Sequence, residues 1–299
     1  MGKIAFVFSG QGDQYPGMGK ELADRYASAA RVFEMCDAIR PKTSWQCFEG
    51  STEELKETNN TQPCLFAMEL AGAAVLKEKG VVPNAVAGFS LGEVAAATVS
   101  GVFDEETGFR MVCKRGQLMQ QEAVKQDTSM AAVIKLTSNQ VESIAGMYPN
   151  VYPVNYNCPG QTSVSGLKEE MTEFAVKVKE EGGRAVFLKV QGAFHSPFME
   201  EAAKGFEKEL KQVTVKKPNI TLYSNMTASP YTDDVVGLLS NQIKSPVLWE
   251  NIICNMIDEG IDTFIEIGPG KTLTNMIKKI NTKVKAVTMT EYLTEEDKW

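Results

Sequence analysis

The sequence predicts an α/β fold in which a mostly parallel sheet, covered by helices on both faces, is interrupted by a smaller inserted unit. Short apolar strands alternate with longer helical patterns through most of the 299 residues, as in a parallel sheet. Between about residues 128 and 190 the order becomes β-α-β-β-α-β, that of a ferredoxin-like unit. With 43% hydrophobic and 23% charged residues, the composition is that of a globular protein with a sizeable core.

The first predicted strand is the uninterrupted apolar run 4–8, and the loop after it lies where open α/β sheets keep their sites. Gly10 and Gly12 match the first two glycines of a dinucleotide fingerprint, but Tyr15 stands where the third belongs, so we reject that site. The next predicted elements are helices near 19–39 and 65–79, the second opening after Pro63, then a strand at 81–88 and a helix at 105–124.

The inserted unit is predicted to contain strands at 130–136, 151–157, 162–164 and 184–190 and helices at 138–147 and 168–181. We therefore expect residues 128–190 to form a ferredoxin-like small domain, and residues 1–127 and 191–299 to form one large domain. The large domain resumes with a helix at 197–213, a strand at 220–224, a helix at 248–259 and a strand at 263–267.

The glycine-rich run that follows this last strand, Gly-Pro-Gly-Lys-Thr at 268–272, looks like the end of a phosphate loop. The loop's first glycine would have to be residue 265, which is Ile265, so we reject a nucleotide site there. The tail 290–299 is polar enough that we expect it to fray.

Composition also excludes several classes of protein. No apolar run approaches the ~20 residues that span a bilayer, and the run 4–8 is too short for a signal-peptide core, so we expect a cytoplasmic protein without a membrane partner. The net charge of −7 argues against a nucleic-acid partner. Six cysteines without Cys-x-x-Cys spacing, together with one histidine, indicate reduced thiols and no metal site.

The stretch Gly-Phe-Ser-Leu-Gly-Glu at 88–93 is the strongest local signal. A serine with a glycine two residues away on each side, between an apolar strand and the helix-forming run 94–99, fits a tight strand-to-helix turn with Ser90 at its apex. The following helix would direct its free N–H groups toward the serine oxygen. In a chain with 24 glycines the same pattern also arises as a small-residue turn without chemistry.

A nucleophilic serine needs a general base, and imidazole is the usual one because its pKa lies at about 6.5. The chain has a single candidate, His195, on a loop where the inserted unit returns to the large domain. A lone histidine is more often structural, but this position at a domain cleft favours a functional role. No Asp or Glu is an obvious third member, so a backbone carbonyl or an amide would have to orient the ring.

Seven ordered motifs resemble the malonyl-CoA:acyl-carrier-protein transacylase family of bacterial fatty-acid synthesis, which is related to the acyltransferase domains of polyketide synthases. They include Ser-Gly-Gln-Gly at 9–12, the serine motif at 88–93 and Ala-Phe-His-Ser-Pro at 193–197. The others lie at 115–120, 155–161, 241–249 and 266–270. The resemblance covers nearly the whole chain and implies an α/β-hydrolase-like large domain that carries the catalytic site.

The resemblance implies that Ser90 attacks the thioester of malonyl-CoA and that His195 is the base. The backbone N–H groups of Gln11 and Leu91 would bind the oxyanion. The backbone carbonyl of Gln242 would orient the imidazole, which accounts for the missing acid. No cofactor or metal is implied, since malonyl-CoA and holo-acyl carrier protein are substrates.

The same resemblance assigns the substrate carboxylate to Arg115, whose planar fork suits two parallel hydrogen bonds. From the helical pattern alone, Arg110 and Lys114 are equally good inward-facing cations. The resemblance also places Phe194 beside the malonyl α-carbon, where its ring limits room for a methyl branch. Phe89 is a departure, because many relatives have histidine there. Further expected pocket residues are Phe89, Met119, Asn157 and Gln161.

The expected reaction is therefore malonyl transfer from coenzyme A to the pantetheine thiol of acyl carrier protein, for fatty-acid or polyketide synthesis, by a monomer. Two alternatives stay open. One is a hydrolase that clears acyl groups from carrier proteins, against which Arg115 argues, because a carboxylate clamp has no use for monocarboxylic chains. The other is a non-catalytic module that binds carrier proteins.

Overall fold

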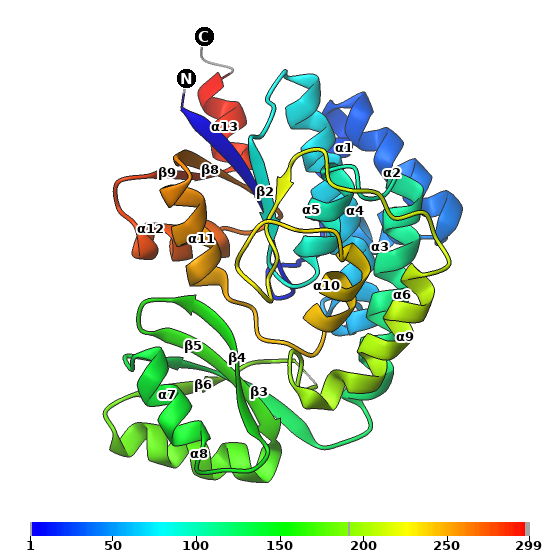
Figure 1. The fold of residues 1–299 in the computed structure, drawn as a ribbon. Coiled ribbons are helices and arrows are strands. Elements are labelled where there is room, and N and C mark those ends of the chain that lie inside the picture. Colours follow the sequence, from blue (N-terminus) through cyan, green and yellow to red (C-terminus); the bar gives the residue numbers. More distant parts are fainter. Residues whose placement is uncertain (1, 191, 297–299) are drawn as a thin grey trace.

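The computed structural model describes residues 2–190 and 192–296 of the chain, arranged as a large α/β body with a smaller β-sheet unit beside it (Figure 1). Within those residues the main sheet has five strands, all parallel, in the order β7-β2-β1-β8-β9. They are β1 (Lys3–Phe8), β2 (Ala85–Gly88), β7 (Thr221–Leu222), β8 (Ile261–Ile267) and β9 (Lys285–Thr288). The parallel sheet predicted from the sequence is confirmed.

Both faces of this sheet are covered, which explains why β1 is apolar at every position from Ile4 to Phe8. Phe6 and Phe8 enter the core on one face, whereas Ala5 and Val7 enter the core on the other. The first face is covered mainly by α2 (Ala27–Ile39), α4 (Thr58–Glu78), α5 (Gly92–Val99) and α6 (Glu105–Ala123). The second is covered by α11 (Trp249–Asp258) and α12 (Thr272–Ile280).

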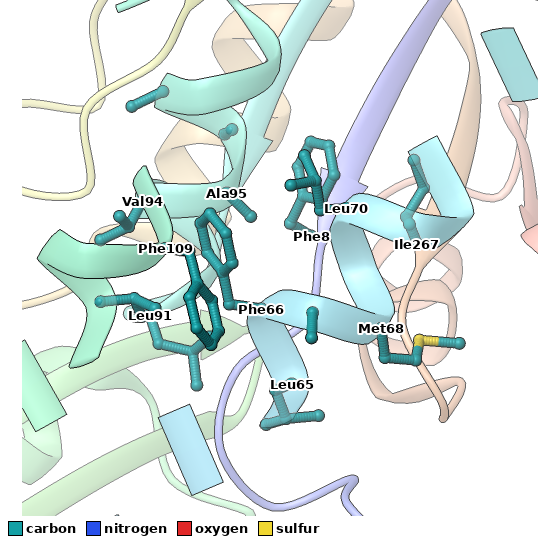
Figure 2. Close-up of a cluster of buried hydrophobic side chains, with 14 of the residues drawn as sticks. Phe8, Leu65, Phe66, Met68, Leu70, Leu91, Val94, Ala95, Phe109 and Ile267 are labelled. Atoms are coloured by element: carbon teal, nitrogen blue, oxygen red, sulfur yellow. The ribbon is translucent and has the colours of Figure 1, made fainter. Parts of the chain in front are cut away.

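The core on the first face reaches directly under the serine motif (Figure 2). Phe66 of α4 and Phe109 of α6 pack with ring centroids 6.0 Å apart. Leu91 and Val94, which follow Ser90 in the chain, are buried in the same cluster. The start of α5 is therefore anchored by apolar packing, and the turn before it has little freedom to move.

The remaining helical segments complete the large body. They are α1 (Lys20–Arg25), α3 (Thr43–Glu49), η1 (Glu54–Lys56), η2 (Pro197–Met199), α9 (Glu200–Leu210), α10 (Val235–Gln242) and α13 (Met289–Glu296). In the part of the chain described here, no helix combines the length and the apolar character that crossing a membrane requires.

Several expectations about helix ends were wrong. The helix expected to open after Pro63 begins at Thr58, five residues before that proline. The side chain of Gln120 accepts the N–H of Thr58 at 2.9 Å, so a tertiary contact overrides the proline signal. The segment 19–39 is two helices, because Tyr26 between them is extended. The tail is not frayed over 290–296, since α13 buries Leu293 against the core; residues 297–299 lie outside the described part.

A second sheet contains the strands β3 (Thr128–Ile134), β4 (Val151–Cys158), β5 (Gln161–Leu167) and β6 (Arg184–Phe187). Its strand order is β4-β5-β3-β6 and every pair in it is antiparallel. Helices α7 (Ser138–Ala145) and α8 (Lys168–Glu180) bury one face of this sheet in a separate apolar core. An isolated parallel bridge between Asn155 and Val247 joins β4 to the large body.

The glycine-rich run 268–272 has a structural explanation that needs no phosphate. The buried carboxylate of Glu266 accepts the N–H groups of Leu273 and Thr274 at 3.0 and 2.7 Å, at the first turn of α12. The donors that a phosphate would use are therefore already paired within the protein.

This buried cap is expected to contribute strongly to stability. Glu266→Ala leaves two buried N–H groups without an acceptor and should lower the free energy of unfolding by about 1–3 kcal/mol, measured by urea denaturation at pH 7. Glu291→Ala is the matched control, because the carboxylate of Glu291 accepts the N–H of Thr288 at 3.0 Å at an exposed position. We expect it to cost less than about 1 kcal/mol, and equal losses in the two variants would contradict the prediction.

Candidate active site

Ser90 lies at the abrupt turn between β2 and α5 and has a left-handed backbone with φ of 57°. The two flanking glycines are required by close backbone approach. A Cβ on Gly88 would lie 1.9 Å from the carbonyl carbon of Gly92, and one on Gly92 would lie 2.4 Å from the carbonyl oxygen of Phe8. The turn is therefore a nucleophile elbow of the kind expected from the sequence.

His195 and Ser90 meet although they are 105 positions apart in the chain. The Ser90 Oγ and the His195 Nε2 are 2.7 Å apart. The Nδ1 atom lies 2.9 Å from the backbone carbonyl of Gln242, which only accepts, so Nδ1 carries the proton and Nε2 is free to accept the serine proton. The geometry expected for Gln242 is therefore present, with no acidic residue in the third position.

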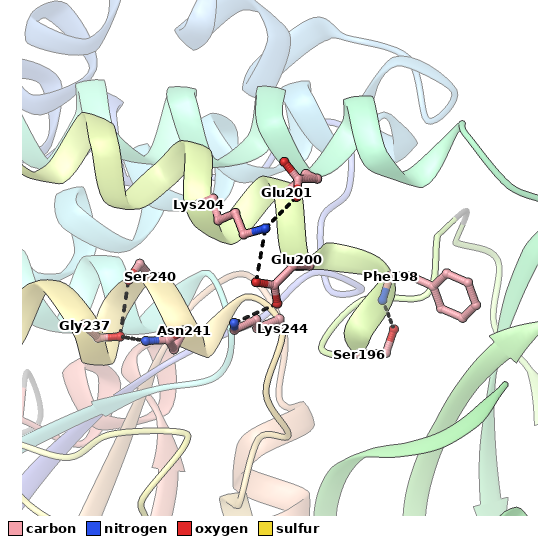
Figure 3. Close-up of polar contacts among 9 residues, drawn as sticks. All are labelled: Ser196, Phe198, Glu200, Glu201, Lys204, Gly237, Ser240, Asn241 and Lys244. Carbon is pink, nitrogen blue, oxygen red and sulfur yellow. Dashed lines mark hydrogen bonds and ion pairs between the residues drawn. The ribbon is translucent and has the colours of Figure 1, made fainter. Parts of the chain in front are cut away.

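The loop that carries His195 is held at the imidazole residue and just after it. Its own N–H donates to the carbonyl of Ile243 at 3.1 Å, and its φ of 60° is again left-handed. Just after it, the hydroxyl of Ser196 accepts the N–H of Phe198 at 3.3 Å, and Glu200 at the start of α9 pairs with Lys244 at 2.7 Å (Figure 3). His195 and the start of α9 are thus both bonded to the segment that follows α10.

Burial sets the charge state of the imidazole. His195 is 3% exposed, and burial lowers its pKa to about 4, with the positive charge of Arg115 acting in the same direction. The backbone carbonyls of Gln242 and Ser245 oppose this shift without reversing it. The ring is therefore neutral at pH 7, which is the state that a general base requires.

Of the three basic residues in the middle of α6, only Arg115 faces the site. Arg110 and Lys114 are exposed, whereas Arg115 is 1% exposed, and burial lowers its pKa to about 10, so it stays charged at pH 7. Its Nη1 donates to the Gln62 side chain at 2.8 Å. Its Nη2 donates to the Gln242 side chain at 2.7 Å and to the Ser90 Oγ at 3.3 Å.

The partners of this guanidinium are neutral. Within the described residues Arg115 forms no ion pair, and its Nε is buried without an acceptor. A buried cation with amide partners and one spare N–H can bind an anion that enters the site. Such an anion would lie close to the Ser90 hydroxyl, because the Arg115 Nη2 is 3.3 Å from the Ser90 Oγ.

A pocket of about 80 Å³ opens above Ser90. It is lined by Gln11, Gln62, Phe89, Ser90, Leu91, Met119, Met130, Asn155, Leu188, Val190, Phe194 and His195. The backbone N–H groups of Gln11 and Leu91 have no protein acceptor among the described residues, so both are available to a ligand oxygen. Phe194, Phe89 and Met119 therefore lie where the sequence predicted.

Two expected pocket residues lie elsewhere. Asn157 and Gln161 line an adjoining cavity of about 240 Å³ on the far side of Phe89 and Leu188, which border both spaces. The side chain of Asn157 donates to Ser163 at 3.1 Å within the small sheet. Phe89 itself packs edge-on against Trp249 with ring centroids 5.6 Å apart, so the aromatic residue before the serine has a packing role.

Sequence reasoning missed a buried polar cluster behind the elbow. The Oδ1 of Asn225 accepts the N–H of Ser90 at 2.8 Å, and its Nδ2 donates to the carbonyl of Gly88 at 2.6 Å. The carboxylate of Glu93 accepts the Asn225 N–H at 3.0 Å and the Tyr231 hydroxyl at 2.6 Å. Burial raises the pKa of Glu93 to about 7. Glu93 sits in the recognised serine motif, but nothing local marks Asn225.

Comparison with known proteins places this arrangement in a family. The chain matches the acyl transferase domain family over residues 5–294. It is 36% identical over 299 aligned residues to a malonyl CoA-acyl carrier protein transacylase of Bacillus subtilis, covering 97% of this chain and 94% of that protein.

Solved structures agree. The crystal structure of malonyl CoA-acyl carrier protein transacylase from Clostridium perfringens matches with a TM-score of 0.94 at 37% identity, covering 99% of this chain and 97% of that one. A malonyl-transacylase in complex with a type II PKS acyl-carrier protein matches with a TM-score of 0.92 at 31% identity, covering 96% and 95%.

Fold and site together define an α/β protein whose serine stands at a strand-to-helix elbow beside a single buried imidazole. Within that class, the chain belongs to the acyl transferase domain family. The resemblance identified from the sequence motifs is confirmed.

The charge state of His195 can be tested with a fluorophosphonate, which reacts with activated serines. Because the pKa of the imidazole is lowered to about 4, the neutral base persists below the usual range, and the rate is lost as the pH falls through that value. We predict a flat rate of Ser90 labelling from pH 8 down to about pH 5, with circular dichroism confirming the folded state at each pH. An inflection near pH 6.5 would show an ordinary solvated imidazole.

Proposed function

We propose that the protein is an [acyl-carrier-protein] S-malonyltransferase, which moves a malonyl group from malonyl-CoA to the pantetheine thiol of acyl carrier protein. One observation carries the proposal: the Ser90 Oγ lies 2.7 Å from a neutral imidazole and 3.3 Å from a buried guanidinium that has no carboxylate partner among the described residues. The nucleophilic oxygen thus has a base and an anion receptor within hydrogen-bonding distance.

In the first half-reaction, Ser90 attacks the thioester carbonyl while the His195 Nε2 takes the hydroxyl proton. The tetrahedral intermediate collapses when the C–S bond breaks, and the imidazolium returns the proton to the departing coenzyme A thiolate. The products are a malonyl-serine ester and free coenzyme A. The Nδ1–H donated to the Gln242 carbonyl keeps the ring in the tautomer that this sequence of transfers needs.

In the second half-reaction, the pantetheine thiol of the carrier protein occupies the position that coenzyme A has left. The neutral His195 takes the thiol proton, the sulfur attacks the ester carbonyl, and the C–O bond to Ser90 breaks with return of the proton to the serine oxygen. Serine and imidazole supply the nucleophile and the base, so the proposed reaction requires no metal or cofactor.

We assign the stabilisation of the negative charge that develops on the substrate carbonyl oxygen to the backbone N–H groups of Gln11 and Leu91. Both residues line the pocket around Ser90, and neither N–H is used by the protein in the described residues. Loss of one such donor costs about 3 kcal/mol of transition-state stabilisation in acyl-transfer enzymes.

Arg115 is assigned to bind the free carboxylate of the malonyl group. An acetyl group would leave the buried guanidinium without an anion, at a cost of about 3–5 kcal/mol relative to malonyl by analogy with broken buried ion pairs. The ring of Phe194, which is 6% exposed at the edge of the pocket, is assigned to limit branching at the α-carbon.

The domain organisation is part of the same proposal. We assign residues 1–127 and 191–299 to an α/β-hydrolase-like catalytic domain, supported by the parallel sheet and the elbow of Ser90. Residues 128–190 are assigned to an inserted ferredoxin-like domain, supported by the order β3-α7-β4-β5-α8-β6 and by the strand order β4-β5-β3-β6. The boundary residue 191 lies outside the described part of the chain.

The partners follow from the chemistry. A carrier-protein partner is supported by the related transacylase solved in complex with an acyl-carrier protein. A cytoplasmic location is supported by the six cysteines, all of which are free thiols, as a reducing compartment allows. The monomer expected from the sequence stays a prediction.

Intact-mass measurement tests the proposed function. Incubation with malonyl-CoA should add one malonyl group to the wild-type protein and none to Ser90→Ala, because the hydroxyl is the acceptor. Addition of holo-acyl carrier protein should then transfer the group to the carrier. Dominant release of free malonate would favour the hydrolase, and absence of any adduct would favour the binding module.

Substitution of the cation tests the specificity assignment. Arg115→Ala should lower kcat/KM for malonyl-CoA by about 100-fold or more, and it should relatively favour acetyl-CoA, because only the malonyl group loses its counter-charge. Lys114→Ala is the matched control, since Lys114 is the preceding helix residue but pairs with Glu209 at the surface. An unchanged preference for malonyl over acetyl in Arg115→Ala would defeat the assignment.

A further inference from the structure

The carbonyl of Ser90 is held by a side chain from a distant part of the sequence. The Gln242 Nε2 donates to this carbonyl at 2.6 Å, from a position 152 residues away. The N–H of Glu93 donates to the same oxygen at 3.1 Å in the first turn of α5. Both lone pairs of the carbonyl are therefore used, and the direction of the C=O bond is fixed.

Fixing this carbonyl also fixes the N–H on the other side of the peptide bond. A trans peptide is planar, so the C=O of Ser90 and the N–H of Leu91 point in opposite directions. The carbonyl is directed at the amide of Gln242, and the Leu91 N–H has no acceptor among the described residues and belongs to the wall of the pocket. The hydrogen bond from Gln242 thus sets where the proposed oxyanion donor points.

The amide of Gln242 can adopt only one of its two orientations. Arg115 offers donors and no acceptor, so the atom of Gln242 that faces its Nη2 at 2.7 Å must be the oxygen. The nitrogen is then left to face the Ser90 carbonyl. It also lies 3.2 Å from the Oδ1 of Asn225, which in turn accepts the Ser90 N–H. Arg115 and Asn225 together determine which way the amide points.

We propose that the Gln242 side chain is a positioning residue that aims the Leu91 N–H at the substrate carbonyl oxygen, and that Arg115 sets the orientation of that amide. This inference rests on the proposed function, because it assigns the Leu91 N–H to the oxyanion. It gives Gln242 a role distinct from its backbone carbonyl, which contacts His195. The residue that binds the malonyl carboxylate and the peptide that binds the oxyanion are then joined through one side chain.

A fluorophosphonate without a carboxylate separates these roles, because it needs the oxyanion donor but makes no use of the cation. Ser90 forms a P–O bond, the P–F bond breaks, fluoride leaves, and the serine proton passes to His195. Gln242→Met keeps the backbone carbonyl and the side-chain length while removing the amide. We expect its second-order rate of Ser90 phosphonylation to fall at least about 10-fold.

Gln117→Met is the matched control, since it makes the same exchange at an exposed position of α6, and Gln117 does not line the pocket around Ser90. Its phosphonylation rate should stay within about 3-fold of wild type. Gln242→Glu is a second variant, used in case Gln242→Met fails to fold, because its side chain has the same shape as glutamine. The carboxylate still accepts from Arg115 but cannot donate when ionised. This variant should therefore show the same slow phosphonylation as Gln242→Met.

Two results would overturn the inference: phosphonylation of both folded Gln242 variants at the wild-type rate, or an equal loss in Gln117→Met. Both results come from the phosphonylation of Ser90, a measurement that does not involve malonyl-CoA. A wild-type protein that is phosphonylated but never forms a malonyl adduct would instead overturn the proposed function.

Discussion

The conformation of Ser90 is the constraint on which the rest of the site depends. A left-handed backbone at a residue with a side chain costs about 1 kcal/mol or more and persists only where the surroundings hold it. Here both sides of the residue are held: the Asn225 Oδ1 binds its N–H, and the Gln242 Nε2 binds its carbonyl. The close approach of Gly88 to Gly92 beneath it leaves no room for the turn to relax.

The electrostatics of the site follow from burying one cation among neutral partners. Burial lowers the pKa of His195, and the positive charge of Arg115 adds to this effect, so both keep the imidazole neutral. In the proposed reaction, a malonyl carboxylate paired with the guanidinium would cancel part of the effect of Arg115 and make the imidazole a stronger base. Glu93 neutralises the cation only in part, because burial raises the pKa of its carboxyl to about 7, which leaves the group about half protonated at pH 7.

The sequence predicts those parts of the site that depend on local backbone geometry or on residue counts. The elbow was predictable because Gly88 and Gly92 are required by local crowding, and His195 because it is the single imidazole. The choice of Arg115 over its two basic neighbours needed the family motif, since a helical pattern does not say which cation is buried. Asn225 could not be found, because its role depends on a contact 135 residues away.

The same distinction between local signals and distant contacts explains which elements of the fold were predicted and which were missed. Strand β1 was predicted from its continuous apolar run and helix α6 from its helical periodicity, whereas α10, α12, β9 and α13 were not predicted. Helix α4 begins before Pro63 because tertiary contacts favour an earlier start. Short elements near the end of a chain are fixed by what they pack against, as Leu293 of α13 is fixed by the core. Local propensity carries little information about such contacts.

The segment 242–248 connects the catalytic groups to the second sheet through its backbone. Within it, the Gln242 carbonyl orients the imidazole, the Ile243 carbonyl accepts the N–H of His195, and Val247 exchanges backbone hydrogen bonds of 2.8 and 2.9 Å with β4. Because these contacts are made by main-chain atoms, they fix the positions of the imidazole and β4 independently of most side chains in the segment. Gln242 is the exception, since its amide reaches the Ser90 carbonyl and Arg115 from the same point of the chain. A displacement of this segment would therefore move the imidazole, the guanidinium and the Ser90–Leu91 peptide together, so we expect the groups of the site to be coupled rather than independent.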